Sequence, residues 1–248
     1  MQLTFLGTGD VRQVPVYGCD CPACSTAHQD RRLRRKPCSA LLELGELRIL
    51  LDGGLTNLAE RFAPGELNAI LLTHYHVDHV QGLFHLRWGL NDNLPVYGPD
   101  DRDGCADLLK HPGILDFRPP LTAFVPFRLG ELKITPLPLQ HSKPTFGYLF
   151  EHGGRRIAYL TDTVGLPEET ERFLQGFANL EMVIDCSQPP RPEPPRNHND
   201  LNLVVAIHQR LQPTRTWLTH IGHEMDTWLL EHALPQGLAI ARDGTALD

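Results

Sequence analysis

Four potential metal ligands lie within six residues of this 248-residue chain, in the pattern H-x-H-x-D-H. They are His74, His76, Asp78 and His79. The apolar run Ala69–Thr73 before them predicts a buried strand, and Val80–Leu90 after them has the apolar periodicity of a helix. Imidazoles and carboxylates in a buried turn are costly unless something pairs with them. A bound cation is therefore the interpretation that this pattern favours.

Three more candidate ligands follow apolar runs later in the chain, namely His141, Asp162 and His220. A divalent ion takes about four to six donors, and two ions can share one carboxylate. We therefore predict a first set made of His74, His76, His141 and Asp162. The second predicted set combines the same Asp162 with Asp78, His79 and His220. The alternative is that the three later residues are only hydrogen-bonded groups at strand ends.

The elements expected to position these ligands are strands and helices mixed throughout the chain. Turns at Gly130-Glu131 and Gly153-Gly154 predict hairpins, which exclude a purely parallel sheet. Asp200 is predicted to cap a helix over Leu201–Leu211. The tail Leu238–Leu247 is predicted to form a small hairpin around Asp243-Gly244.

The two halves of the chain show a weak internal similarity. The run Arg48–Asp52 resembles Arg156–Asp162, and Ile70–His74 resembles Thr216–His220. Each half thus has one strand that ends in Asp and one that ends in Thr-His. We expect two similar β-rich halves whose strand ends converge at one rim.

Length and composition fit one globular domain over residues 1–248 with a small zinc-binding loop at about 18–38. No apolar run reaches the roughly 18 residues that a membrane span needs, and the first residues lack the pattern of a signal peptide. We therefore expect a cytoplasmic protein that does not bind membranes. The net charge of −7 disfavours nucleic acid as the general partner.

A second metal site is predicted from Cys19, Cys21 and Cys24, because three thiolates at this spacing suit a structural zinc ion. We choose His223 as the fourth ligand, since it lies three residues after His220. The other candidates for the fourth ligand are His28, Cys38, Cys105 and Cys186. The alternatives without zinc are three free thiols, or a redox C-x-x-C motif, which the absence of a surrounding βαβ pattern disfavours.

Three further features carry possible catalytic or binding groups. His198 follows a loop with five prolines in positions 189–195, where it is suitably placed to be a general acid, or is simply a surface histidine. Lys143 follows the candidate ligand His141 and can meet a phosphate, or is simply a solvated side chain. The basic run Arg31–Lys36 is either a binding surface for the phosphate of a substrate or for RNA, or a solvated connecting segment.

The metal motif, with Asp52 before it and His141, Asp162 and His220 after it, resembles the metallo-β-lactamase superfamily. This resemblance implies an α/β fold, a four-layer αβ/βα sandwich of two mixed sheets flanked by helices. It also implies two metal ions with a bridging hydroxide, and a supporting role for Asp52 in orienting the ligand loop. The flavodiiron branch has Glu where His76 stands, which disfavours that branch.

Within this superfamily the chain is similar to the PhnP-like phosphodiesterases of the carbon–phosphorus lyase pathway. The matching runs are residues 18–24, 71–84, 141–149, 194–202 and 218–223. The resemblance implies hydrolysis of 5-phospho-α-D-ribosyl 1,2-cyclic phosphate to ribose 1,5-bisphosphate in phosphonate catabolism. It further implies two Mn²⁺ or other divalent ions in the active site, one structural Zn²⁺ and a homodimer, with His198 as the catalytic histidine. We place Asp78 beside His198 among the catalytic residues.

The predicted mechanism uses two cations to polarise the phosphate and to lower the pKa of a bridging water. The resulting hydroxide attacks phosphorus, and His198 protonates the departing alkoxide. Competing hypotheses are another cyclic-nucleotide or RNA phosphodiesterase of the tRNA 3′-processing type, a thioester hydrolase of the glyoxalase type, and a non-catalytic metal-binding scaffold. No insertion long enough for a tRNA-binding arm is found, and the thioesterase hypothesis explains neither Cys19–Cys24 nor His198.

Overall fold

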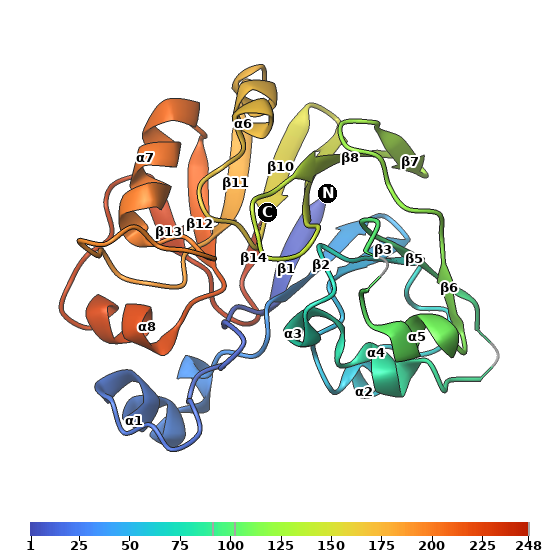
Figure 1. Ribbon diagram of the computed structural model, residues 1–248, viewed down its shortest axis with the longest axis horizontal. Helices are drawn as coiled ribbons and strands as arrows, with labels where there is room; N and C mark the ends of the chain where they lie inside the picture. The colour runs from blue at the N-terminus through green and yellow to red at the C-terminus, as the bar shows by residue number, and fades with distance from the viewer. Residues whose placement is uncertain (91, 102, 248) are drawn as a thin grey trace.

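The computed structural model describes residues 1–90, 92–101 and 103–247. Two seven-stranded sheets pack face to face, and helices cover their outer faces (Figure 1). This arrangement confirms the predicted α/β fold of two mixed sheets flanked by helices. Among the described residues no helix is both long enough and apolar enough to cross a membrane.

The first sheet is antiparallel on one side and parallel on the other. Its order is β14-β1-β2-β3-β4-β5-β6, and the pairs from β14 to β3 are antiparallel whereas those from β3 to β6 are parallel. The strands are β1 Gln2–Gly7, β2 Ser39–Leu44, β3 Leu47–Leu51, β4 Ala69–Leu71, β5 Leu94–Tyr97, β6 Leu115–Phe117 and β14 Ala246–Leu247.

The second sheet repeats this pattern in the order β13-β12-β11-β10-β9-β8-β7. The pairs from β13 to β10 are parallel and those from β10 to β7 are antiparallel. The strands are β7 Phe127–Leu129, β8 Leu132–Pro138, β9 Phe146–His152, β10 Arg155–Leu160, β11 Leu180–Asp185, β12 Arg215–Thr219 and β13 Leu238–Ile240. The expected two similar halves are therefore present.

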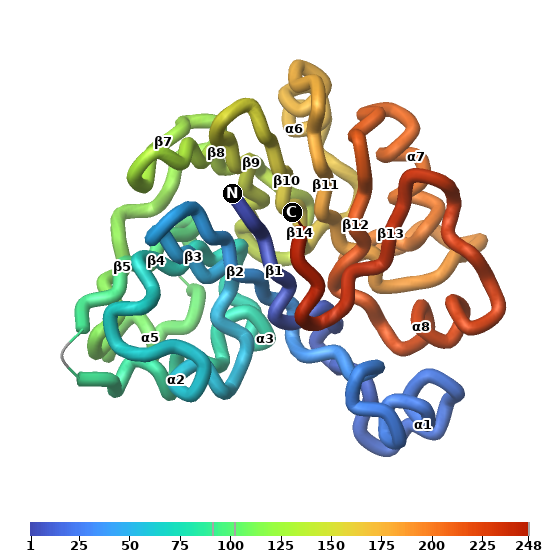
Figure 2. Tube along the Cα trace, turned by 180° about the vertical axis from the view of Figure 1, so that it is seen from behind, coloured from blue at the N-terminus to red at the C-terminus, as the bar shows by residue number. Residues whose placement is uncertain are grey.

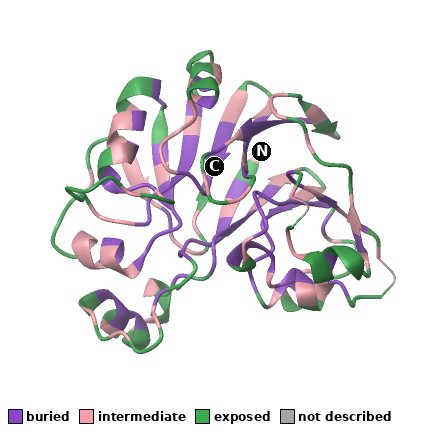
Figure 3. Cartoon of the chain, in the orientation of Figure 1, coloured by how far each residue is buried: buried purple, intermediate pink, exposed green. Residues whose placement is uncertain are grey.

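Side chains alternate between the two faces of each sheet, which creates a core between the sheets and one on each outer face. On β3, Ile49 and Leu51 contact the opposite sheet, while Leu50 lies in the cluster beneath the helices. Full burial of such a side chain stabilises the fold by roughly 1.5–3 kcal/mol. Figure 3 shows the buried residues concentrated along the strands and at the strand ends that meet in the centre of the molecule.

Short helices cover the first sheet and longer ones the second (Figure 1). The first group is α2 Leu58–Arg61, α3 Val77–Val80, α4 Leu83–Leu86 and α5 Ala106–Lys110. The second group is α6 Glu168–Gln175, α7 Leu201–Leu211 and α8 His223–Leu229. Asp200 caps α7 as predicted, because its carboxylate accepts the amide proton of Leu203. Helix α1, Pro22–Gln29, projects at the edge of the molecule near α8 (Figures 1 and 2).

Two sequence predictions about elements are wrong. The helix predicted over Val80–Leu90 is instead the two short helices α3 and α4, because the amide of Gly82 donates to the carbonyl of Gly53 and leaves the helical pattern. The predicted tail hairpin does not form, since β13 pairs with β12 and β14 pairs with β1. The tail therefore connects the edge of the second sheet to the edge of the first.

Candidate metal centre

Strand ends from both sheets bring the predicted ligands together. Residues 72–79 follow β4, Asp162 follows β10 and His220 follows β12. Because parallel neighbours end at the same edge of a sheet, the carboxyl ends of these strands form one rim. The loop after β8 contributes His141 from the antiparallel part of the second sheet.

Three imidazoles form the first candidate ion site. His76 places Nδ1 2.8 Å from Nε2 of His74 and 3.0 Å from Nε2 of His141. Oδ2 of Asp162 lies 3.8 Å from the Nε2 atoms of both His74 and His141. The structure thus brings together all four residues of the first predicted set, and the three nitrogens converge as they would around one cation.

The second candidate site lies on the other side of Asp162. Its Oδ2 is 3.3 Å from Nε2 of His79 and 3.3 Å from Nε2 of His220. Asp78 places its own Oδ2 3.5 Å from His79 and 3.6 Å from His220. Asp162 therefore lies between the two predicted sets, where a carboxylate can bridge two ions.

The ring nitrogen that points away from the centre has an oxygen partner in each of these five histidines. Asp52 lies 2.8 Å from Nδ1 of His79, and Ser187 Oγ lies 3.0 Å from Nδ1 of His220. The partners of the other three are Thr73 Oγ1 for His74, Ser142 Oγ for His76 and the Asn197 carbonyl for His141. A proton on the outer nitrogen leaves the inner one as a lone-pair donor, as metal-binding histidines require.

Asp52 holds the ligand loop in place, in agreement with its expected supporting role. Its carboxylate accepts hydrogen bonds from the amide and the hydroxyl of Thr73 in addition to the bond with His79. Asp52 adopts a left-handed backbone with φ of 60°, which is uncommon for a residue other than glycine. A Cβ on Gly54 would lie 1.7 Å from the carbonyl oxygen of Asp78, so glycine is required there for the loop to pack.

Buried polar atoms without partners indicate that this centre suits a cation. Within the described part of the chain, Nε2 of His79 and Nε2 of His220 are buried and make no hydrogen bond. Burial lowers the pKa of His74, which favours the neutral imidazole. Burial also opposes a charge on His220, but the carboxylates of Asp162 and Asp78 outweigh it and raise its pKa to about 9. The carboxylates thus attract positive charge to the centre, and His and Asp donors of this kind fit divalent ions.

His198 lies beside the centre, and a residue that the sequence analysis overlooked holds it there. Its Nδ1 is 3.2 Å from Oδ2 of Asp185 and 3.9 Å from Oδ2 of Asp162. Asp185 is fully buried and also accepts hydrogen bonds from the amide of Thr163 and from Asn199. The signal was present in the sequence, since the apolar run Met182–Ile184 is followed directly by Asp185, much as the run Ile157–Leu160 comes shortly before Asp162.

The three cysteines and His223 also come together, at the start of α1 and of α8. The Sγ atoms of Cys19 and Cys21 are each 3.4 Å from Nδ1 of His223, and all four ligand atoms lie within 4.8 Å of one another. Burial raises the pKa of the Cys24 thiol to about 12, so a cation is needed before all three thiols ionise. Of the other candidates for the fourth ligand, Cys38 is buried elsewhere and contacts Tyr159 and Thr219.

Two basic features of the sequence have carboxylate partners in the structure. Nζ of Lys143 is 2.9 Å from Oδ2 of Asp101, so its charge is already paired. In the run Arg31–Lys36, Arg35 is fully buried and its guanidinium forms two hydrogen bonds with Asp226. For Arg35, therefore, neither interpretation holds: this residue is neither part of an exposed binding surface nor solvated.

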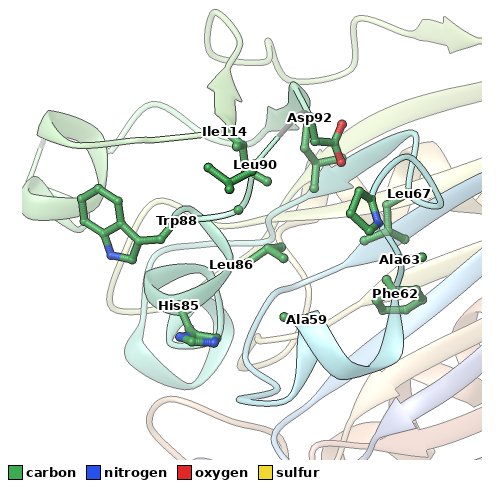
Figure 4. Close-up of a pocket in the computed structure, with 13 residues that line it drawn as sticks. Ala59, Phe62, Ala63, Leu67, His85, Leu86, Trp88, Leu90, Asp92 and Ile114 are labelled. Atoms are coloured by element: carbon green, nitrogen blue, oxygen red, sulfur yellow. The ribbon is translucent and has the colours of Figure 1, made fainter.

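An apolar pocket of about 220 Å³ lies between α2, α4 and the segment after α4. Its lining includes Phe62, Leu67, Leu86 and Ile114, and Trp88 stands at its edge (Figure 4). None of the candidate metal ligands lines this pocket.

Comparison with known proteins gives one family match and several relatives. The model of the β-lactamase superfamily domain matches residues 47–221, more than half of the chain. An octanoyltransferase of Porphyromonas gingivalis is 31% identical over 244 residues, which cover 90% of this chain and 46% of that protein. A ribonuclease Z of Thermococcus kodakarensis is 26% identical over 177 residues, covering 65% of this chain and 50% of that protein. The chain thus spans about half the length of these two relatives.

Solved structures share the fold along nearly the whole chain. A diphosphatase from the PhnP family superposes with a TM-score of 0.83 at 27% identity, covering 99% of this chain and 96% of its own. The Zn²⁺-bound PqqB from Methylobacterium extorquens superposes with a TM-score of 0.80 at 20% identity, covering 100% of both chains. The second likeness shows the fold alone.

Proposed function

This chain belongs to the metallo-β-lactamase superfamily, and we propose that it is a hydrolase that cleaves phosphoric diesters with two divalent cations. The observation that carries this proposal is the position of Asp162 between the two histidine sets, with His198 beside them. Residues in this arrangement would hold two divalent ions, which would supply charge stabilisation for a displacement at phosphorus. The 27% identical diphosphatase from the PhnP family supports chemistry at phosphorus.

The donor atoms of the chain define which residues would hold the two ions. His74, His76 and His141 with Asp162 would hold one, and Asp78, His79 and His220 with Asp162 the other. When bound, divalent cations supply a hydroxide nucleophile at neutral pH and neutralise the phosphate. Donors of this kind, without thiolates, accept Mn²⁺, whereas the Cys₃His cluster selects Zn²⁺.

The residues of the chain then provide orientation and proton transfer. Asp52 and Ser187 fix the rings of His79 and His220 through their Nδ1 atoms. Asp185 fixes the ring of His198 through Nδ1, which leaves Nε2 to carry the proton that the departing alkoxide needs. His198 is stacked on His220 at a ring distance of 4.6 Å, so this proton is held beside the candidate ligands.

For the substrate we propose 5-phospho-α-D-ribosyl 1,2-cyclic phosphate, which would be opened to ribose 1,5-bisphosphate. The matching sequence runs and the PhnP-family neighbour, which covers 99% of the chain, support this choice. RNA is the second candidate substrate, because ribonuclease Z relatives share 26% identity over 65% of the chain. A phosphoanhydride is the third, because the PhnP-family neighbour is a diphosphatase.

A substrate comparison tests this proposal. The metal-free protein is assayed with and without added Mn²⁺ on the ribosyl cyclic phosphate, a 2′,3′-cyclic nucleotide, a pre-tRNA and a nucleoside diphosphate ester. We expect Mn²⁺-dependent turnover with the highest kcat/KM on the ribosyl cyclic phosphate. Cleavage of pre-tRNA while the ribosyl compound stays intact would contradict the proposed substrate, and no turnover of any phosphorus compound would contradict the proposed reaction class.

A further inference from the structure

A polar cavity of about 360 Å³ opens between His198 and the proline-rich loop that precedes it. Arg191, Glu193 and Arg196 line this cavity, and His198 lines it as well. Because Nδ1 of His198 is 3.9 Å from Oδ2 of Asp162, the cavity adjoins the candidate metal centre. Its volume lies in the range of about 300–1,000 Å³ that is typical of sites for small ligands.

The loop that carries the two arginines is held in one conformation by its ends and by its prolines. The amide of Arg191 donates to Oδ2 of Asp200, and Asn202 donates to the carbonyl of Arg191. The amide of Leu201 donates to the carbonyl of Gln188 at the other end of the loop. Five prolines in positions 189–195 further limit the conformations of the backbone. The backbone at Arg191 therefore loses little conformational entropy when a ligand binds.

The two guanidinium groups differ from the other cations near the centre because neither is neutralised. Among residues 1–90, 92–101 and 103–247, neither Arg191 nor Arg196 has an ion-pair partner, and both are exposed. Lys143, by contrast, is paired with Asp101. Two unpaired guanidinium groups on a constrained loop suit bidentate recognition of a phosphate.

We infer that Arg191 and Arg196 form a subsite for a phosphomonoester group that the substrate carries in addition to its reacting phosphodiester. This inference rests on the proposed function, for which it names the residues that recognise the 5-phosphate. Glu193 lines the same cavity and reduces its net charge from +2 to +1. Removal of the Glu193 charge should therefore strengthen the attraction between the cavity and a phosphate dianion.

Turnover of two substrates tests the subsite on the reaction itself. Ribose 1,2-cyclic phosphate with and without a 5-phosphate is given to the Mn²⁺-loaded wild type, Arg191→Ala, Arg196→Ala and Glu193→Gln. We expect the wild type to prefer the phosphorylated compound in kcat/KM, and each arginine variant to reduce this preference by about tenfold or more. Glu193→Gln is expected to lower KM for the phosphorylated compound. Arg128→Ala, which removes an exposed arginine of β7, is the matched control and should keep the wild-type preference.

A binding measurement separates failure of the subsite from failure of the proposed function. Calorimetry compares ribose 5-phosphate and ribose on the Mn²⁺-loaded wild type and on the Arg191→Ala/Arg196→Ala double variant. Tighter binding of ribose 5-phosphate to the wild type than to the double variant would support the subsite. If neither cyclic phosphate were turned over, that lack of turnover would contradict the proposed function but not the subsite. Equal affinity in both proteins, or an unchanged substrate preference in both single arginine variants, would overturn the subsite.

Discussion

Oδ2 of Asp162 lies 3.3–3.9 Å from a nitrogen of each of the histidines 74, 79, 141, 198 and 220. Histidines 74, 79, 141 and 220 are candidate ligands. His198 is not, and its Nδ1 lies 3.2 Å from the carboxylate of Asp185. A histidine at this distance can either bind an ion or transfer a proton. Measuring both the bound metal and kcat of a variant at His198 therefore distinguishes these two roles.

We expect His198→Ala to keep both active-site ions and to lose about 10²–10⁴-fold in kcat, the usual contribution of a general acid. The bound metal is measured by elemental analysis of the same sample that is assayed. A variant that loses one ion would show that His198 is a ligand. Gln188→Ala, which alters another residue that lines the cavity beside His198, provides the control for a change near the loop.

Asp185→Asn is expected to reduce kcat by about 10–100-fold with little change in KM, because the amide no longer fixes the proton of His198 on Nδ1. The measurement is the dependence of kcat on pH for wild type and variant. If Asp185 has only a structural role, the variant should show a lower melting temperature and an unchanged profile of kcat against pH. Asp226→Asn, which alters a buried carboxylate that pairs with Arg35, is the control for loss of a buried carboxylate.

Helices, strands and motifs could be predicted from the sequence where they depend on residues that are close together in the chain. The H-x-H-x-D-H motif, the cap of α7 and most strands follow from neighbouring residues, and all seven predicted ligands of the centre come together. The tail strands were not predictable, because β14 pairs with β1 at the other end of the chain, whereas β13 pairs in parallel with β12 on the other side of α8. The break between α3 and α4 also depends on a distant group, the carbonyl of Gly53.

Charge partners were the other feature that sequence could not show. A basic run looks the same whether its arginines are exposed or buried, and only the fold brings Asp226 to Arg35 and Asp101 to Lys143. That Arg191 and Arg196 have no ion-pair partner in the described part of the chain likewise became visible only in the structure. Asp185 is different, because it follows an apolar run in the sequence, as Asp162 does.

The cysteine cluster gives a prediction for the segment around α1. Cys19→Ser and Cys24→Ser should each lose the structural zinc ion and lower the melting temperature, because Cys24 lies in a core of few buried residues, with Val14 and Ala27. Zinc content and thermal unfolding are the measurements, and Cys105→Ser, outside the cluster, is the control. Unchanged zinc content in both variants would show that these thiols are free.

For the whole molecule, the buried pair of Arg35 and Asp226 connects the first segment of the chain to α8 and to the tail. The guanidinium of Arg35 also donates to Thr8 and to the carbonyl of Ala241. Arg35 thus joins segments that enter both sheets, since Thr8 follows β1 and Ala241 follows β13. The ion pair joins two residues that are far apart in the sequence, and the side chain of Arg35 is completely buried.

We expect Arg35→Ala to lower the free energy of unfolding by about 3–5 kcal/mol, since it leaves the carboxylate of Asp226 buried without its partner. The exposed pair of Arg32 and Asp30 is the matched comparison, and Arg32→Ala should lower the free energy of unfolding far less, because water screens this pair. Urea unfolding of the three proteins at one pH measures both values. Equal losses in the two variants would contradict a special role of the buried pair.

Cleavage of a phosphodiester is proposed to require two divalent ions that the residues around Asp162 would hold, and a metal titration tests this claim most directly. Mn²⁺ is added to the metal-free wild type and to Asp162→Ala while bound metal and turnover of the ribosyl cyclic phosphate are measured on the same samples. We expect wild-type activity to reach its maximum at two bound Mn²⁺ ions per chain, and Asp162→Ala to bind fewer ions and to remain inactive. Full activity of the wild type without Mn²⁺, or wild-type activity of Asp162→Ala, would contradict this claim.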